Sequence, residues 1–290
     1  MAGPRHGSGR GATDVITDIG RSEDPDRPVQ LWFCANDDLP PDHAALLAAH
    51  WFDEEEKRTA QAFLFERDRR QYLVAHTLVR RVLALETGLA EDELHFWRSS
   101  RGRPFLRVPA GGLLRGGRQL DFNLSHASGC NLLGVTRAHT IGVDVERLDR
   151  DPRSFHTILQ TFAARERHWV AEAATGAARD RRTMRLWTLK EAYAKARGLG
   201  LGLPFDSFSF TLAEDRGVLG FEPPADDRYG QWTFVELEPA PDVLAAVVIQ
   251  TDPFTDPVMH LHRGFPWART APHRVALPAP AAVAATPAYR

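Results

Sequence analysis

The hexapeptide IGVDVE, residues 141–146, alternates aliphatic and acidic side chains and predicts a strand. Successive side chains of a strand point to opposite faces, so the three aliphatic residues share one face and Asp144 and Glu146 share the other. At ~3.3 Å rise per residue the two carboxylates lie roughly 7 Å apart, and like charges this close favour a cation between them. A hard divalent cation such as Mg²⁺ takes such oxygen ligands. A solvent-facing strand with two solubilising acids has the same pattern, so both interpretations stay open at this point.

A second motif, LWTLKEAYAKARGLGL at 186–201, has the period of a helix. Trp187, Glu191 and Lys195 are spaced i, i+4 and i+8, which places them in one stripe, and the small alanines between them allow close approach to a neighbour. The chain has only three lysines among 36 basic residues, and two of them, Lys190 and Lys195, fall here. Lysine is a compact charge that can lose its proton when desolvated. The stripe is therefore either an exposed Glu–Lys pair or a functional face.

Groups suited to holding an anion occur in three further segments. Arg98, Arg101 and Arg103 surround a turn at Gly102, and six arginines without an acid lie between residues 97 and 118, at positions 98, 101, 103, 107, 115 and 118. Arginine holds phosphate by bidentate hydrogen bonds, and turn amides can add to them. The stretch FNLSH at 122–126 ends a predicted strand with Asn123, Ser125 and His126, and Arg67, Arg69 and Arg70 begin a long predicted helix. A solvated basic loop and an ordinary loop histidine are the alternatives.

Length and composition set the outer limits. The chain has 290 residues, 43% hydrophobic and 26% charged, with a net charge of −2, as in an ordinary globular protein of about two domains. Near-neutral charge gives no reason to expect nucleic-acid or membrane binding, and no apolar run reaches the ~20 residues of a membrane span. Two distant cysteines, Cys34 and Cys130, exclude a disulfide framework and fit the cytoplasm.

The order of predicted elements gives an α+β protein with two halves. We expect a flexible leader at 1–28, an N-terminal α+β half at 29–148, a C-terminal half at 149–251 and a Pro/Ala-rich tail at 252–290. The strands are predicted at 29–35, 94–98, 119–125, 130–136, 140–146, 206–212, 231–237 and 243–250. The helices are predicted at 42–49, after an N-cap at Asp53, at 66–86 with Gly88 as C-terminal residue, at 154–172 and at 179–197.

Taken in order, these segments resemble the 4′-phosphopantetheinyl transferases, specifically the Sfp-like branch that activates carrier proteins. The resemblance covers roughly 55–210 and is carried by RSSRGRPFL (98–106), DFNLSHA (121–127), IGVDVE (141–146), LWTLKEAYAKARGLGL (186–201) and DSFSF (206–210), with a weaker match in FLFERD (63–68). It implies a pseudo-twofold pair of α/β halves with coenzyme A in the cleft between them.

The resemblance also implies a set of site residues. Asp144, Glu146 and Glu191 look like ligands of a magnesium ion that bridges to the coenzyme A pyrophosphate. The groups that would hold coenzyme A are Arg67, Arg98, Arg101, Gly102, Arg103, Asn123, Ser125, His126 and Lys195, together with Asp144 and Glu191. Glu166 looks like a further acid of the Sfp-like branch. Gln71 stands where some members carry a basic residue, which leaves the contact to the 3′-phosphate open.

The expected reaction moves phosphopantetheine from coenzyme A to a serine of an apo carrier protein. In it Glu191 or a water it holds is the base, Lys195 and His126 stabilise charge on the phosphates, and Asp144 belongs to the catalytic group with them. The carrier belongs to a polyketide, nonribosomal peptide or fatty acid synthase, and we expect it to contact apolar residues around Phe155–Trp169. A monomer is expected, since both halves lie in one chain. The rivals are a magnesium-dependent pyrophosphatase acting on coenzyme A and a non-catalytic module that binds coenzyme A or carrier protein.

Overall fold

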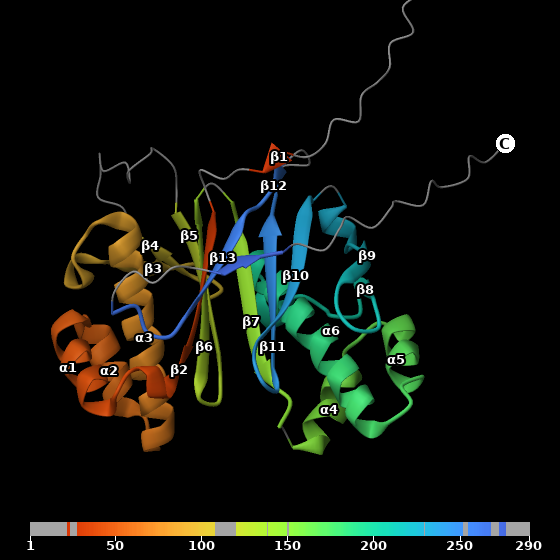
Figure 1. Ribbon diagram of the computed structural model, residues 1–290, viewed down its shortest axis with the longest axis horizontal. Helices are drawn as coiled ribbons and strands as arrows, with labels where there is room; N and C mark the ends of the chain where they lie inside the picture. The colour runs from red at the N-terminus through yellow and green to blue at the C-terminus, as the bar shows by residue number, and fades with distance from the viewer. Residues whose placement is uncertain are drawn as a thin grey trace, which may run out of the picture.

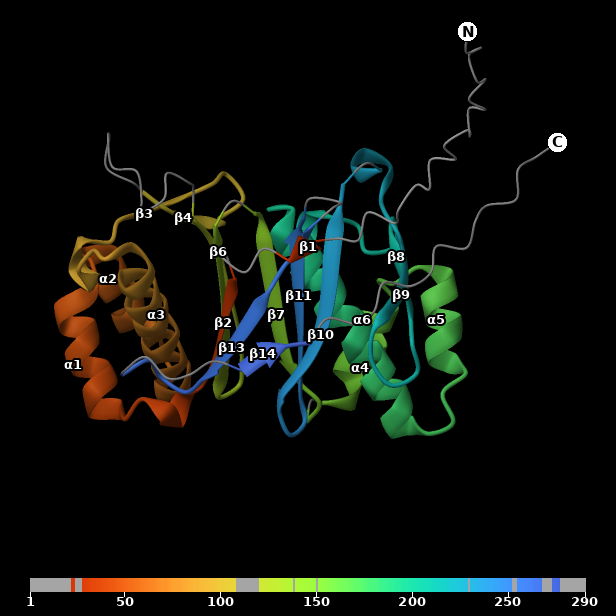
Figure 2. The same cartoon turned by 45° about the horizontal axis from the view of Figure 1, so that its top comes forward.

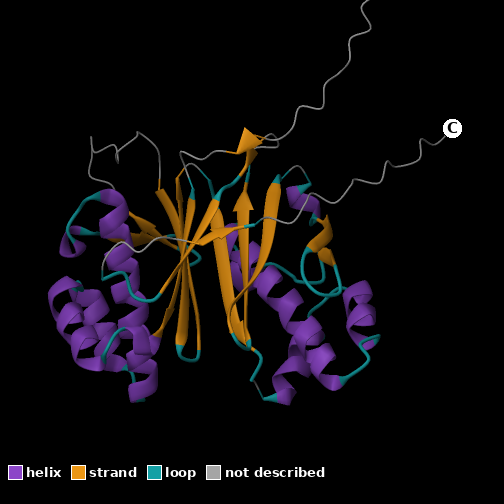
Figure 3. Ribbon diagram, viewed as in Figure 1, coloured by secondary structure: helices purple, strands orange, loops and turns teal. Residues whose placement is uncertain are grey.

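The computed structural model describes residues 22–23, 28–107, 120–137, 139–149, 151–228, 230–251, 255–267 and 273–276. It is built from helices on two outer sides and sheets between them, as Figure 1 and Figure 3 show. The expected α+β class is confirmed. The expected leader, apart from residues 22, 23 and 28, lies outside the described residues, as do Arg115, Arg118 and the end of the expected tail from residue 277.

Two larger sheets stand side by side in the middle of the molecule. The five-stranded sheet has the order β14 (His273–Val275), β13 (Met259–Arg263), β2 (Val29–Ala35), β6 (Cys130–Arg137) and β5 (Leu120–Ala127). The three-stranded sheet has the order β10 (Trp232–Ala240), β11 (Val243–Gln250) and β7 (Ile141–Arg147). Neighbouring strands are antiparallel except β13, which runs parallel to β2. Three small pairs complete the strands: β1 (Ser22–Glu23) with β12 (Thr255–Asp256), β3 (Phe96–Arg98) with β4 (Pro104–Leu106), and β8 (Ser209–Leu212) with β9 (Val218–Glu222).

Each sheet carries helices on its outer face. Helices α1 (Pro41–Trp51), α2 (Glu54–Ala62) and α3 (Glu66–Thr87) lie on one side of the molecule, and α4 (Pro152–Leu159), α5 (Ala164–Ala171) and α6 (Gly176–Ala196) lie on the other, as Figures 1 and 2 show. The predicted caps are confirmed. Asp53 accepts the amides of Glu55 and Glu56 at the start of α2, and Gly88 ends α3 with a φ of 79°.

Apolar side chains fill three layers. One cluster lies between α3 and the five-stranded sheet, with Leu78 and Leu133 among its buried members. A second lies between α6 and the three-stranded sheet and includes Leu189. The third lies between the two sheets and takes the aliphatic face of β7, Val143 among it. Because one face of β7 is buried against the other sheet, its opposite face is directed toward α6. No helix in the described part of the chain is both long and apolar enough to cross a membrane.

Three expectations about the organisation are corrected. The helix predicted at 154–172 is two helices, because the Glu166 carboxylate accepts the Ala163 amide at 3.0 Å and so starts a new helix there. The halves change between β6 and β7 rather than after Arg147, since β7 pairs with β11. Within the expected tail, β13 is a strand of the five-stranded sheet, and its His262 ring stacks on Trp32 with centroids 4.0 Å apart.

Candidate functional site

The site is created where α6 crosses β7. Gly142 permits this crossing, because a Cβ on it would lie 2.0 Å from the Ala192 carbonyl oxygen and 2.4 Å from the Ala196 amide nitrogen. No side chain fits in that space, so the helix backbone rests on the strand backbone. The predicted stripe of Trp187, Glu191 and Lys195 thereby meets the acidic face of β7.

Asp144 accepts two side-chain hydrogen bonds at this crossing. It is only 3% exposed. Its Oδ1 accepts a hydrogen bond from Lys195 Nζ at 2.6 Å and another from Ser125 Oγ at 2.8 Å. Lys195 Nζ also donates to Ser125 Oγ at 2.8 Å, so the three side chains form a closed triangle. The structure therefore brings together three residues that the sequence placed on three separate segments.

Glu146 is held by a residue that the sequence analysis did not count as part of the site. Trp187 Nε1 donates to Glu146 Oε1 at 2.8 Å, and Glu146 is buried. The tryptophan therefore fixes the second carboxylate of the acidic strand. The i, i+4, i+8 stripe was the signal for this role, because it placed Trp187 on the same helix face as Glu191 and Lys195.

Glu191 lies half-buried one helical turn before Lys195. Burial raises the pKa of its carboxyl group to about 7, and the negative charge of Asp144 adds to the increase, while Lys195 opposes it. A carboxyl group with a pKa near neutrality can accept and release a proton at the pH of a cell.

Two of the site carboxylates, Asp144 and Glu146, are buried and could hold a divalent cation. In the described part of the chain no group of three or more His, Cys, Asp or Glu side chains is arranged to hold a metal ion. Mg²⁺ needs only one or two carboxylates, because it completes its shell with water and substrate phosphates. Asp144 Oδ2 is buried without a hydrogen-bond partner, and a carboxylate oxygen in that state suits a hard cation. The residues thus fit a magnesium ion shared with a phosphate, and the metal itself stays a prediction.

The side chains of Asp121, Asn123 and Ser125 on β5 join the two halves beside this site, and we call these three residues the β5–β7 seam. Asp121 Oδ2 accepts the Ile141 amide at 2.9 Å, and Asn123 Oδ1 accepts the Val143 amide at 2.8 Å. Ser125 follows with its bond to Asp144. The seam consists of alternate residues of one strand, which point to the same side. Asn123 was expected to contact coenzyme A, but its side-chain oxygen holds the backbone of β7.

Arg103 also belongs to the fold rather than to an exposed phosphate clamp. Its guanidinium donates to Asp121 Oδ2 at 2.7 Å, to the Ile141 carbonyl at 2.8 Å and to the Lys195 carbonyl, and its side chain is 7% exposed. These partners occupy the group, so we withdraw its assignment to phosphate. Arg98 and Arg101 are exposed on the same hairpin, and Gly102 takes a φ of 83° in the turn. Those three positions stay predictions for substrate contact.

His126 lies exposed at the end of β5, on the α3 side of the triangle. Partial burial lowers the pKa of its imidazole below 6.5, and the positive charges of Lys195 and His76 lower it further. Arg67, at the start of α3, is 82% exposed and forms an ion pair with its neighbour Asp68 at 3.3 Å. Both residues stay predictions for phosphate binding.

Gln71 stands where some family members carry a basic residue, and the basic residue beside it, Arg70, is engaged within the fold. Gln71 Nε2 donates to Asn131 Oδ1 at 2.6 Å, and Arg70 donates to the Asn36 carbonyl at 2.6 Å and to the Leu39 carbonyl. Both side chains therefore hold α3 to the sheet and the loop after β2.

Residues of two other predictions, a further acid of the site and a carrier contact, lie in the core. Glu166 is 1% exposed and pairs with Lys190 Nζ at 2.9 Å, and it also accepts the Phe210 amide. It is a structural ion pair apart from the α6–β7 crossing. Phe155 and Ile158, expected at a carrier contact, are buried in the core beneath α4, because the apolar face of that short helix turns inward.

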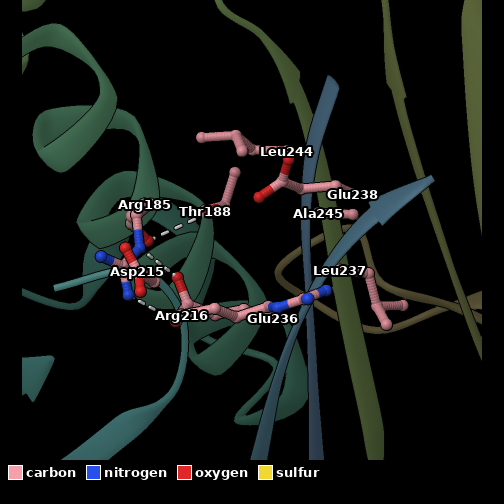
Figure 4. A pocket seen from close by; sticks show the side chains of 9 residues that line it. All are labelled: Arg185, Thr188, Asp215, Arg216, Glu236, Leu237, Glu238, Leu244 and Ala245. Atoms are coloured by element: carbon pink, nitrogen blue, oxygen red, sulfur yellow. Dashed lines mark hydrogen bonds and ion pairs between the residues drawn. The ribbon is translucent and has the colours of Figure 1, made fainter. Parts of the chain in front are cut away.

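A small cavity lies beside the middle of α6, where Arg185 and Thr188 line it, as Figure 4 shows. Arg185 is buried there, and its guanidinium makes a fork on the Glu236 carboxylate at 2.8 and 2.9 Å while donating to the Ala213 and Glu214 carbonyls. The cavity has a volume of about 10 Å³, enough for one water. None of the predicted site residues lines it.

Two family models match the chain, one on each half. Residues 39–135 match the model described as 4′-phosphopantetheinyl transferase, N-terminal, and residues 140–248 match the 4′-phosphopantetheinyl transferase superfamily. Their border coincides with the change of sheet between β6 and β7.

Individual relatives carry the same family name. The chain is 31% identical to a phosphopantetheinyl transferase of Thraustochytrium over 57% of this chain and 59% of that protein. It is 28% identical to an L-aminoadipate-semialdehyde dehydrogenase-phosphopantetheinyl transferase of Xenopus laevis over 66% of each chain, and 28% identical to a 4′-phosphopantetheinyl transferase of Nostoc over 76% of this chain and 87% of that one. The matched part thus spans less than two thirds of the length of each of the first two relatives, 59% and 66%.

The sequence matches and the structure agree on where the halves meet and on what lies there. Both models describe one enzyme family, and between them they cover β5, β7, β10, most of β6 and β11, and the crossing of α6 on β7. The chain belongs to the 4′-phosphopantetheinyl transferase superfamily.

Proposed function

We propose that this chain transfers the 4′-phosphopantetheine arm of coenzyme A to a serine of an apo carrier protein and releases adenosine 3′,5′-bisphosphate. The observation that carries the proposal is the triangle of Asp144, Lys195 and Ser125 beside Glu191. It puts a cation, a buried carboxylate and a proton acceptor at one point between the two halves. Phosphoryl transfer needs these groups, since its catalysis is mainly positioning and charge stabilisation.

In the reaction the serine oxygen forms a bond to the β-phosphorus, and the bond from that phosphorus to the oxygen of the adenosine bisphosphate breaks. The serine proton passes to Glu191 or to a water it holds, because its carboxyl group has a pKa of about 7. Lys195 Nζ stabilises the negative charge that develops on the transferred and leaving phosphates, and His126 adds a hydrogen-bond donor. Asp144 keeps Lys195 in place.

Asp144, together with Glu146 or Glu191, would hold magnesium, whose remaining ligands would be water and substrate phosphates, and when bound it would neutralise the pyrophosphate. Asp144 Oδ2, which is buried and without a hydrogen-bond partner, supports this assignment. Arg67, Arg98 and Arg101 are the exposed basic groups proposed for the rest of coenzyme A.

The partners and setting complete the proposal. The acceptor is an apo carrier protein of a polyketide, nonribosomal peptide or fatty acid synthase, as in the Sfp-like branch, and the enzyme acts as a monomer in the cytoplasm. The cytoplasmic setting is supported by both cysteines, which are buried free thiols. Burial raises the pKa of the Cys130 thiol, which keeps it unreactive.

Intact-protein mass spectrometry of an apo carrier incubated with this chain, coenzyme A and Mg²⁺ tests the function. A mass gain of one phosphopantetheine arm that EDTA abolishes is the expected result, and several carriers compared side by side report the substrate range. Cleaved coenzyme A without modified carrier would replace the proposal by a hydrolase. Unconsumed coenzyme A with every carrier would replace it by a binding module.

A further inference from the structure

One arginine closes the end of the β5–β7 seam that lies away from Asp144. Arg103 follows the turn between β3 and β4, and its side chain is 7% exposed. Its guanidinium donates to the carboxylate of Asp121 and to backbone carbonyl oxygens of Ile141, Lys195 and Ala196.

These partners belong to three elements that form the site. Asp121 lies on β5, Ile141 begins β7, and the carbonyls of Lys195 and Ala196 lie in the last turn of α6. Carbonyls in the last turn of a helix have no partner inside it, and the Lys195 carbonyl accepts from the Gly198 amide at 3.0 Å as well as from Arg103. A planar guanidinium with five donors reaches all of these acceptors at once, whereas a lysine offers a point charge on a flexible stem.

The hydrogen bond from Arg103 reaches Lys195, whose ammonium group carries the proposed catalytic charge. The backbone carbonyl of Lys195 accepts from Arg103, and the Nζ of the same residue donates to Asp144 and Ser125. Lys195 is therefore fixed at both ends. Asp121 and Ser125 are four residues apart on one strand face, so Arg103 and the triangle are the two ends of one connected seam.

We propose that Arg103 and Asp121 are a positioning pair, which sets Lys195 against Asp144 by holding the end of α6 to β5 and β7. The inference rests on the proposed function. In this proposal neither Arg103 nor Asp121 contacts the substrate. Its effect is on the step in which Lys195 stabilises charge, where a misplacement of about 1 Å can cost about 10²-fold in rate.

The direct test is Arg103→Lys, which keeps the positive charge and loses the planar guanidinium with its several donors. We expect kcat per folded molecule to fall by about 10- to 100-fold, while the KM for coenzyme A changes little. Arg103→Ala supplemented with guanidinium ion is expected to recover part of kcat, and ammonium is expected to recover none. Asp121→Asn, which keeps the size of the side chain, should lower kcat in the same direction and less.

Arg185→Lys is a matched control on the same helix. Arg185 is also buried and also joins a carboxylate to backbone carbonyls. Its guanidinium makes two hydrogen bonds to Glu236, which Figure 4 shows, and it donates to the carbonyls of Ala213 and Glu214. It lies ten residues from Lys195, about 15 Å along the helix. Its substitution should lower stability and leave kcat per folded molecule unchanged, and guanidinium should not alter that kcat.

Amide hydrogen exchange gives a second readout that does not need activity. In Arg103→Lys the amides of the last turn of α6 and of Gly198 and Leu199 should exchange at least several-fold faster, and in Arg185→Lys they should not. A kcat within about two-fold of wild type in Arg103→Lys, or equal exchange in the two variants, would overturn the positioning role. If wild type modifies no carrier, the proposed function fails, and the exchange result still decides whether Arg103 holds the helix end.

Discussion

At the scale of single residues, Glu191 should make stability depend on pH. Its carboxyl pKa is about 7 in the folded protein and 4.5 in an unfolded chain. The folded state then binds more protons between these values, so the free energy of unfolding falls as pH rises from about 4.5 to 7. Glu191→Gln should raise the free energy of unfolding by about 1–3 kcal/mol at pH 8 and leave it unchanged at pH 4. Chemical denaturation at both pH values measures this, and exposed Glu172→Gln is the control. An equal effect at both pH values would contradict it.

At the scale of elements, the contact of α6 with β7 depends on Gly142. Gly142→Ala would place a methyl group 2.0 Å from a backbone oxygen of α6. Since a backbone cannot yield as a side-chain tip does, we expect a loss of about 3 kcal/mol or more in the free energy of unfolding. Gly176→Ala, in the first turn of α6 with nothing within 4 Å, should be neutral or stabilise by up to about 1 kcal/mol. Urea denaturation compares the two, and similar values would show that the elements do not meet so closely.

At the scale of the whole molecule, strand β13, which follows residue 251, is part of the core. Met259 on β13 is fully buried between the sheets, and His273 on β14 is exposed. Met259→Ala should lower the free energy of unfolding by about 2–5 kcal/mol, and His273→Ala should change it by less than about 0.5 kcal/mol. A Met259→Ala protein as stable as wild type would mean that this segment is only a loosely attached arm.

The sequence could predict what periodicity and caps encode. The strand at 141–146, the helix from Glu66 to Gly88 and the stripe on α6 follow from local pattern, and so the acidic face and the lysine were found. It could not predict β13, because a strand that pairs with β2 more than 200 residues away has no local signal beyond its apolar alternation. Arg103 and Asn123 have residue types that suit a ligand, and only the three-dimensional arrangement reveals that other parts of the chain satisfy them.

The central claim is that transfer takes place where α6 crosses β7, with Glu191 as proton acceptor. Intact-mass measurement of carrier modification by wild type, Glu191→Gln and the control Glu172→Gln, each with saturating coenzyme A and Mg²⁺, tests it most directly. We predict a loss of about 10²- to 10⁴-fold in the rate for Glu191→Gln, with an unchanged circular dichroism spectrum, and a wild-type rate for Glu172→Gln. Full activity of Glu191→Gln would contradict the account.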